Sequence, residues 1–146
     1  MAAGSTNINI SFEDAINNQN NAKAQLEDVK SQLSNLLNNY ASSLADAINT
    51  NNFSLIDYYL TYESEIYKQQ QVNIPGSYAE GNQESLVSAY ITNFNISDDL
   101  QSGSITTSER YNFVDMYGAS NEKTFNHVYK FQYNGTISSY QFISRK

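Results

Sequence analysis

The chain has 146 residues, the usual size of one domain built around a single hydrophobic core. Eight Lys and Arg oppose fifteen Asp and Glu, for a net charge of −7, and the basic residues are scattered, so no nucleic-acid partner is expected. The absence of Cys excludes disulfides, thiolate zinc sites and cysteine nucleophiles. Neither an apolar run of ~20 residues nor a signal-peptide core is present, so the domain itself is not expected to contact a membrane.

The N-terminal part of the sequence predicts one long helix. Apolar residues recur every three or four positions from Phe12 to Tyr40, which places them on one helical stripe. Ser11 with Asp14 three positions later resembles a capping box, and the Asn-rich run at 49–52 favours a turn. The helix is therefore expected to start near Ser11 and to end at this run.

The stripe divides the chain into segments. It is weak before Leu26, where Ala and Gln occupy the apolar positions. Residues 11–30 are therefore interpreted as a helical stalk or an N-terminal extension of the first helix, and residues 1–10 as an added or disordered start. The folded domain is expected over residues 31–146.

A second helix is predicted after the Asn-rich run. Ser54 with Asp57 can cap it, and apolar residues at helical spacing carry it to about Gln71. The stretch at 72–76, which contains Pro and Gly, is expected to stop it. Residues 77–84 are expected to form a loop or a further short turn of helix.

The second half of the chain changes to the alternating period of strands. Aromatic residues occupy every second position from Phe125 to Tyr133, with His127 among them, and Tyr90 and Phe94 are expected to share one face in an earlier strand. Four strands joined by short turns predict an antiparallel meander: 86–96, 105–117, 124–133 and 137–143. The expected fold class is α+β, with the N-terminal helices packed on the aromatic face of a curved four-stranded antiparallel sheet. The helices and the curved sheet then enclose either a filled hydrophobic core or a cone-shaped cavity.

A binding pocket is predicted where helix and strand residues meet on this aromatic face: Tyr59, Glu63, Tyr111, His127 and Tyr129. His127 is the only histidine, so a hydrogen-bonded core or pocket role is favoured over catalysis. Phosphate-binding loops, nucleophile elbows and metal-ligand spacings are missing, so no catalytic residue, metal or cofactor is predicted.

Three carboxylates are candidates to approach the aromatic face: Asp57, Glu63 and Glu109. A buried carboxylate beside Tyr hydroxyls would be a candidate for proton abstraction. The favoured interpretation of each is instead a solvated acid at the edge of an element. A cluster of tyrosines at 58–67 could stack a sugar or an aromatic ligand, although the favoured interpretation is that two or three of them pack in the core and the rest reach water.

Two stretches, 56–70 and 123–129, resemble the C-terminal extracytoplasmic domain of the TcaA-like (teicoplanin-resistance-associated) membrane proteins of Gram-positive bacteria. The resemblance covers about residues 33–146. It implies an NTF2-like (cystatin-like) cone, presented outside the cell by a protein with a cytoplasmic zinc ribbon and one transmembrane helix ahead of it. It also implies a role in the cell envelope, and it supplies no catalytic residue. His127 stands where a larger aromatic residue is expected in relatives.

The sequence therefore favours a non-enzymatic binding or interaction domain on the extracellular face of the membrane, part of a membrane-anchored protein that senses cell-wall components or glycopeptides. The expected partner is a cell-wall ligand, a small molecule or another protein, with the domain as a monomer or homodimer. Two alternatives remain. One is a small-cavity enzyme of the isomerase or dehydratase type, and the other is a structural spacer or dimerisation domain.

Overall fold

The computed structural model describes residues 11–146, so the predicted added or disordered start at 1–10 lies outside the described residues. The described chain divides into two units, of which the first ends at Ser31 and the second is Gln32–Lys146. The first unit is helical. The elements in chain order are α2 (Phe12–Thr50), the 3-10 turns η1 (Phe53–Leu55) and η2 (Asp57–Tyr59), α3 (Glu65–Ala79), β1 (Gln83–Ile96), β2 (Ser102–Val114), β3 (Ser120–Asn134) and β4 (Ser139–Arg145).

The bounds predicted for the first helix are confirmed. Ser11 caps α2, because its Oγ accepts a hydrogen bond from the backbone N–H of Asp14 at 3.0 Å. At the other end Asn51 adopts a left-handed conformation with φ +51°, and the N–H of Asn52 donates to the carbonyl of Ala47 at 2.9 Å. This geometry closes the last turn of the helix where the Asn-rich run predicted it.

The second helix differs from the prediction in its start. Residues 53–59 form η1 and η2, and Glu63 then adopts φ +62°, which interrupts any helical path through it. The side chain of Ser64 caps α3 instead, accepting from the N–H of Tyr67 at 3.3 Å. The helical spacing of the apolar residues hid this break, because two short turns and a helix can bury the same positions as one helix.

The prediction that residues 72–76 end the helix is wrong. Pro75 and Gly76 lie inside α3, which continues to Ala79. Proline removes one backbone donor and disfavours the helical conformation at the preceding residue. That residue, Ile74, is fully buried together with Ile66 and Gln70. Burial of this face of α3 offsets the unfavourable backbone conformation and the lost hydrogen bond at Pro75.

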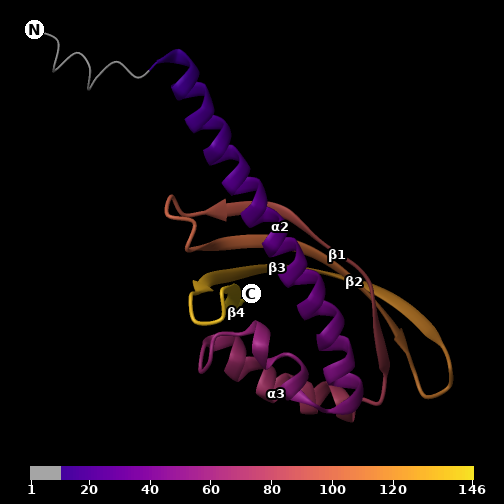
Figure 1. Ribbon diagram of the computed structural model, residues 1–146. Coiled ribbons are helices and arrows are strands. Elements are labelled where there is room, and N and C mark those ends of the chain that lie inside the picture. The colour runs from indigo at the N-terminus through magenta and orange to yellow at the C-terminus, as the bar shows by residue number, and fades with distance from the viewer. Residues whose placement is uncertain (1–10) are drawn as a thin grey trace, which may run out of the picture. The chain divides into compact units, whose positions relative to one another are not determined.

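The predicted antiparallel meander is confirmed, with the order β1-β2-β3-β4. Adjacent strands pair along most of their length, with Leu86 opposite Tyr111 and Glu109 opposite Phe125. Each strand begins or ends a few residues away from the predicted bounds. Figure 1 shows the four strands as a curved sheet, with the C-terminal part of α2 crossing one face and α3 beside it, which is the predicted α+β arrangement.

Two register shifts in β1 correct one prediction about its faces. They lie between Leu86 and Ser88 and between Ile91 and Asn93. Each bulge inserts one residue, so the alternation of faces reverses across it. Tyr90 therefore does not share a face with Phe94. It is 55% exposed, and its neighbour Ala89 is buried in its place.

The core of the second unit lies between α2, α3 and the sheet. Its largest fully buried aromatic residues come from three elements and pack edge to face or tilted: Tyr40 from α2, Tyr129 and Phe131 from β3, and Phe142 from β4. The rings of Tyr129 and Phe142 approach most closely, with centroids 4.4 Å apart. This part of the cone is therefore filled.

The far edge of β4 is partly covered. Leu60 forms an isolated parallel bridge with Phe142, and the N–H of Thr61 donates to the carbonyl of Phe142 at 2.9 Å. The side-chain amide of Gln141 donates to the carbonyl of Tyr58 at 2.8 Å. These contacts attach η2 and the following turn to the last strand.

One side chain fastens the end of α2 to the start of β1. Asn49 Nδ2 donates to the carbonyl of Glu84 at 2.7 Å, and its Oδ1 accepts from the N–H of the same residue at 2.7 Å. An amide side chain thus reproduces the pair of hydrogen bonds that a neighbouring strand would make with Glu84.

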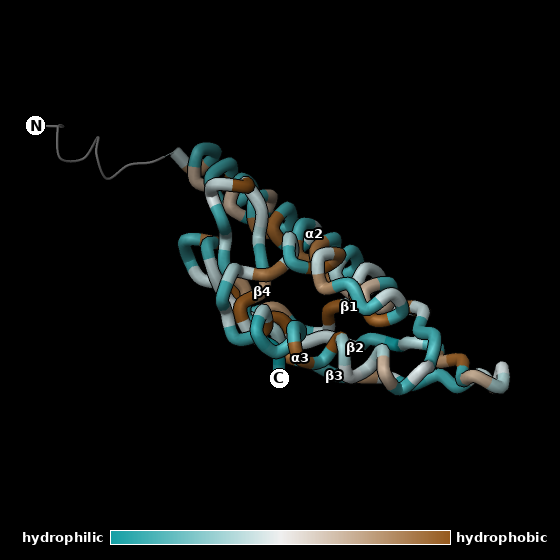
Figure 2. The backbone as a smooth tube through the Cα atoms, turned by 90° about the horizontal axis from the view of Figure 1, so that it is seen from below, coloured by the Kyte–Doolittle hydropathy of each residue, from teal (hydrophilic) through white to brown (hydrophobic). Residues whose placement is uncertain are grey.

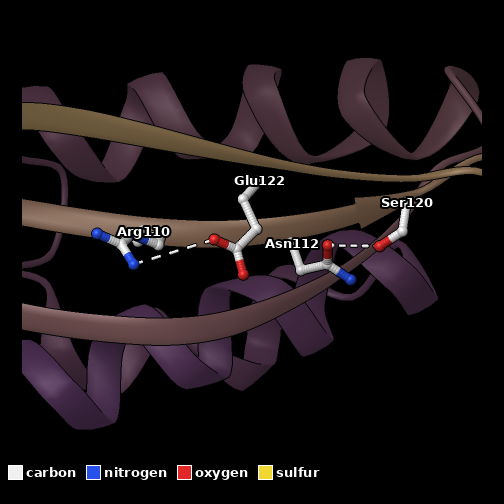
Figure 3. A network of polar contacts seen from close by, with 4 residues as sticks. All are labelled: Arg110, Asn112, Ser120 and Glu122. Carbon is white, nitrogen blue, oxygen red and sulfur yellow. Dashed lines mark hydrogen bonds and ion pairs between the residues drawn. The ribbon is translucent and has the colours of Figure 1, made fainter.

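The face of the sheet opposite the core is polar. Figure 3 shows cross-strand contacts between β2 and β3 on this face, where Arg110 forms an ion pair with Glu122 at 4.0 Å and Ser120 donates to Asn112 at 2.8 Å. Half-exposed ion pairs of this kind contribute little to stability.

Figure 2 shows teal and brown stretches interspersed along residues 11–146. Within residues 11–146, no helix has both the length and the apolar character that crossing a bilayer requires.

Candidate functional site

The centre of the inner face is a carboxylate with three hydroxyl donors. Glu109 of β2 is 0% exposed. Its Oε2 accepts from Thr107 Oγ1 at 2.7 Å and from the hydroxyl of Tyr129 at 2.8 Å, and its Oε1 accepts from the hydroxyl of Tyr111 at 2.9 Å. The strand period brings these groups together, because residues two positions apart point to the same face.

This arrangement corrects the favoured expectation for Glu109, which was a solvated acid. The sequence placed it in phase with Tyr111, and the structure buries both. Asp57 and Glu63, the other two candidates, are exposed. Only one of the three carboxylates therefore reaches the aromatic face.

A second polar cluster lies beside the first. Gln70 of α3 donates from its side-chain amide to the hydroxyl of Tyr40 at 2.8 Å. Burial raises the pKa of Tyr40 to about 12, partly opposed by the nearby Arg145 guanidinium and its hydrogen bond. Burial, followed by the nearby Tyr40 and Glu109, also raises the pKa of Tyr129 well above its usual value, and the positive charge of Arg145 opposes this rise.

Tyr129 therefore lies near two charges of opposite sign. Its hydroxyl donates to the carboxylate of Glu109. The positive charge of Arg145 acts on the same tyrosine and opposes the rise of its pKa.

A cavity of about 320 Å³ opens next to these clusters. Both helices, the residue that follows α3 and all four strands contribute to its wall: Leu44, Ile48, Gln70, Asn73, Ser77, Glu80, Glu84, Tyr111, Phe113, Lys123, Phe125, His127 and Arg145. Aromatic rings form one side, with Phe125 6.1 Å from Tyr111 and 6.3 Å from Phe113 between centroids. The cone is thus filled at one end and hollow at the other.

The cavity carries charges of both signs. Burial raises the pKa of Glu84 to about 6, the nearby carboxylate of Glu80 acts in the same direction, and Lys123 opposes both effects. Burial also lowers the pKa of His127, and so does the positive charge of Arg145. A neutral His127 and a Glu84 that titrates near pH 6 therefore face the same space.

His127 has a defined tautomer in this site. Its Nδ1 lies 3.2 Å from the carbonyl oxygen of Lys146, which can only accept a hydrogen bond. The proton of the neutral ring is therefore assigned to Nδ1, which leaves Nε2 as an acceptor. In the described part of the chain, no three His, Asp or Glu side chains are grouped so that they could hold a metal ion.

The structure brings together only part of the predicted pocket. Tyr111 and His127 line the cavity, and Tyr129 is buried next to it in the Glu109 cluster. Tyr59 lines a different groove near α2, and Glu63 is exposed in the turn before α3.

Sequence reasoning missed several residues of the cavity wall, above all Glu84 and Arg145. The strand that carries Arg145 has a register shift opposite Lys130 and Phe131, so that Phe142 pairs with Phe131 and Arg145 pairs with Tyr129. The alternation read from Tyr140 and Phe142 would place Arg145 on the other face. Nothing else in the sequence indicated that Arg145 would reach the inner face of the sheet.

Residues 29–144 match the family described as the TcaA protein NTF2-like domain. The chain belongs to this family. The resemblance drawn from the sequence is thereby confirmed, and so is the NTF2-like fold class. A comparison with curated protein sequences gave no match.

Solved structures agree with the fold of this TcaA-type domain. The intermembrane space region of the chloroplast protein ARC6 is similar with a TM-score of 0.62 and 11% identity, over 77% of this chain and 90% of that one. An NTF2-like superfamily protein from Salmonella enterica serovar Typhimurium is similar with a TM-score of 0.59 and 10% identity, over 82% and 89%. Aln2 from a Streptomyces species has a TM-score of 0.52 at 10% identity, over 70% and 79%. At these identities the likeness concerns the fold alone.

Proposed function

We propose that this TcaA-type domain is a non-enzymatic binding module of a membrane-anchored cell-envelope protein, displayed on the extracellular face, and that its cavity holds the ligand. Membership of the TcaA family supports the setting. A cavity of about 320 Å³, lined by rings and by a few polar groups, supports binding of a small ligand or of the end of a larger one.

The non-enzymatic assignment rests on the hydrogen bonds of Glu109, whose carboxylate already accepts from three hydroxyls. A general base needs a free lone pair within reach of a substrate proton. The two oxygens of Glu109 accept three hydroxyl donors and are fully buried, so they are committed to holding β2 and β3. The tyrosines around it stay protonated at physiological pH because their pKa values are raised.

The charges in the cavity favour a ligand that carries both an amine and a carboxylate. Glu80 and Glu84 can accept hydrogen bonds from an amine, and Lys123 and Arg145 can donate to a carboxylate. Peptide fragments of the cell wall have both groups, and glycopeptide antibiotics also carry both. We infer that the ligand belongs to one of these classes.

Titration of the full chain with soluble cell-wall peptides and with glycopeptides, followed by 15N-resolved NMR and calorimetry, tests this function. Resonances of the cavity wall should shift, including that of His127. Phe125→Ala, which shortens the aromatic wall, should weaken binding by about tenfold, or about 1.4 kcal/mol. Val128→Ala is the matched control, because Val128 lies on the other face of the same strand with similar exposure, 41% against 38%. Flat responses over the whole panel would contradict the assignment.

One observation favours a second candidate, an enzyme of the small-cavity isomerase or dehydratase type. The half-buried Glu84 has a pKa raised to about 6 and shares the cavity with a neutral His127, which is a pairing suited to proton transfer. Turnover of small carbonyl compounds that is lost in Glu84→Gln, with unchanged binding, would establish this candidate instead.

A further inference from the structure

Tyr58 separates two surface grooves that share no residue with the cavity described above. One groove, of about 300 Å³, lies between the η2–α3 segment and the β3–β4 end of the sheet. The other, of about 200 Å³, lies between α2 and η2. Within residues 11–146, Tyr58 is the one residue that both groove linings contain.

Two tyrosine rings stand exposed along these grooves and are nevertheless held in place. Tyr58 is 56% exposed and Tyr62 is 75% exposed. The ring of Tyr58 packs edge to face against Tyr59, with centroids 5.7 Å apart, and that of Tyr62 packs in the same way against Tyr67 at 5.3 Å. Exposed rings that are already ordered lose little conformational entropy when a ligand stacks on them.

The backbone beneath Tyr58 is fixed from the last strand. Gln141, which is only 7% exposed, donates to the carbonyl of Tyr58 at 2.8 Å and accepts from Asn134 Nδ2 at 3.1 Å. This pair of amides orients the tyrosine and supplies part of the groove lining.

The other polar groups of the lining are mostly neutral. Apart from one carboxylate, Asp57, and the tyrosines, they are amides and a hydroxyl: Gln32, Asn35, Asn39, Asn134, Ser139 and Gln141. Among the described residues, no Lys or Arg lines either groove. Amide side chains offer both donors and acceptors, which suits a ligand with many hydroxyls. A lining without cations disfavours phosphorylated or carboxylated ligands.

We propose that the two grooves beside Tyr58 form a binding site for a neutral oligosaccharide. One sugar ring packs its C–H face on the ring of Tyr58, and neighbouring sugars extend into the two grooves. Their hydroxyls and acetamido groups hydrogen bond to the amides and to Asp57. A long apolar peptide fits less well, because it would offer no polar partner to the amides that line both grooves.

Titration with a neutral oligosaccharide tests the site directly. Tetra-N-acetylchitotetraose added to the 15N-labelled full chain should shift the side-chain amides of Asn35, Asn39, Asn134 and Gln141, which NMR resolves separately from the backbone. Tyr58→Ala should weaken binding by about tenfold or more, whereas Tyr58→Phe, which keeps the ring, should retain most of it. Tyr90→Ala is the matched control, because Tyr90 is 55% exposed on the opposite side of the sheet and should leave the affinity unchanged.

The fold of each variant is verified by its backbone NMR spectrum. If Tyr58→Ala does not fold, Tyr62→Ala removes the more exposed ring and should weaken binding in the same direction. No shift of the groove amides up to about 10 mM sugar, or equal affinities of Tyr58→Ala and Tyr90→Ala, would overturn the proposal. Tighter binding of an oligogalacturonate than of the neutral sugar would overturn the assignment of ligand class. The proposal is independent of the cavity, since a cavity variant such as Phe125→Ala should leave this binding intact.

Discussion

The hydroxyl of Tyr129 donates a hydrogen bond to the carboxylate of Glu109 across 2.8 Å, joining β3 to β2 inside the core. A buried carboxylate is costly to desolvate, and its hydrogen bonds offset that cost only while all of them are present. The cluster around Glu109 is therefore expected to be sensitive to the loss of a single partner.

Replacing Glu109 is the most direct test of this cluster. Glu109→Ala leaves the hydroxyls of Thr107, Tyr111 and Tyr129 without their acceptor and removes the negative charge near Arg145. We expect a loss of about 3 to 5 kcal/mol in the free energy of unfolding, measured by urea denaturation. Glu109→Gln keeps one acceptor oxygen and the volume, so it should lose about half as much. A loss below about 1 kcal/mol for Glu109→Ala would show that the cluster does not stabilise the fold.

The raised pKa of Glu84 predicts a pH dependence of stability. In the folded state this pKa is about 6, against a usual value of 4.5, so the folded chain binds more protons than the unfolded chain between these values. The contribution of Glu84 to the free energy of unfolding should therefore fall as the pH rises from about 4.5 to about 6, and level off near pH 7. The effect should stay below about 1 kcal/mol because the side chain is half exposed and screened.

Two variants separate Glu84 from the other carboxylates. Urea denaturation of Glu84→Gln over the same pH range should lack this slope. Glu80→Gln should lower the pKa of Glu84, measured by NMR of its carboxyl carbon, because the repulsion between the two acids is removed. An unchanged pKa in that variant would show that burial alone causes the shift.

A close backbone approach makes Gly103 hard to replace. A Cβ at this position would overlap the carbonyl oxygen of Asn95 and lie 2.9 Å from Phe131 Cζ. The overlap is with backbone of the paired strand, which cannot move away without disturbing the β1–β2 pairing. Gly103→Ala should therefore destabilise the domain by about 2 to 4 kcal/mol in thermal or urea unfolding. Gly135→Ala, where a Cβ meets nothing within 4 Å, is the control and should change stability by less than about 0.5 kcal/mol.

The opposite effect is expected at Gly76. It lies inside α3, and a Cβ there would meet nothing within 4 Å. Gly76→Ala should stabilise the domain by about 0.5 to 1 kcal/mol, because alanine loses less backbone entropy than glycine on entering a helix. Calorimetry would show this as a higher Tm. A lower Tm would mean that the helix around Pro75 needs the freedom of glycine.

The regular elements could be predicted because their signals are local. The stripe of α2 and the alternating aromatics of β3 repeat over many residues, so the burial of one face decides the structure. Single residues overturned the pattern elsewhere. The left-handed Glu63 broke the second helix, and bulges in β1 and β4 reversed the faces of Tyr90 and Arg145.

The candidate site was less predictable than the fold, since it depends on contacts between distant elements. Tyr111 and His127 could be placed on the inner face from their strand phase. The burial of Glu109 could not, because its cost is offset by hydroxyls from β2 and β3 whose geometry appears only after pairing. Glu84 lies in the sheet because β1 starts at Gln83, three residues before the start predicted for this strand.

The paired hydrogen bonds of Asn49 with Glu84 have a consequence for how such domains diversify. These hydrogen bonds join two residues that are 35 positions apart in the sequence. The segment between them, which contains η1, η2 and α3, therefore begins and ends at the same contact. An insertion in an exposed turn of this segment would leave these two hydrogen bonds intact, whereas its buried residues, such as Ile66 and Ile74, must keep their contacts with the core. This segment contributes residues to the Tyr58 grooves and to the cavity wall. Substitutions in it could therefore change which ligand the domain binds while the sheet stays as it is.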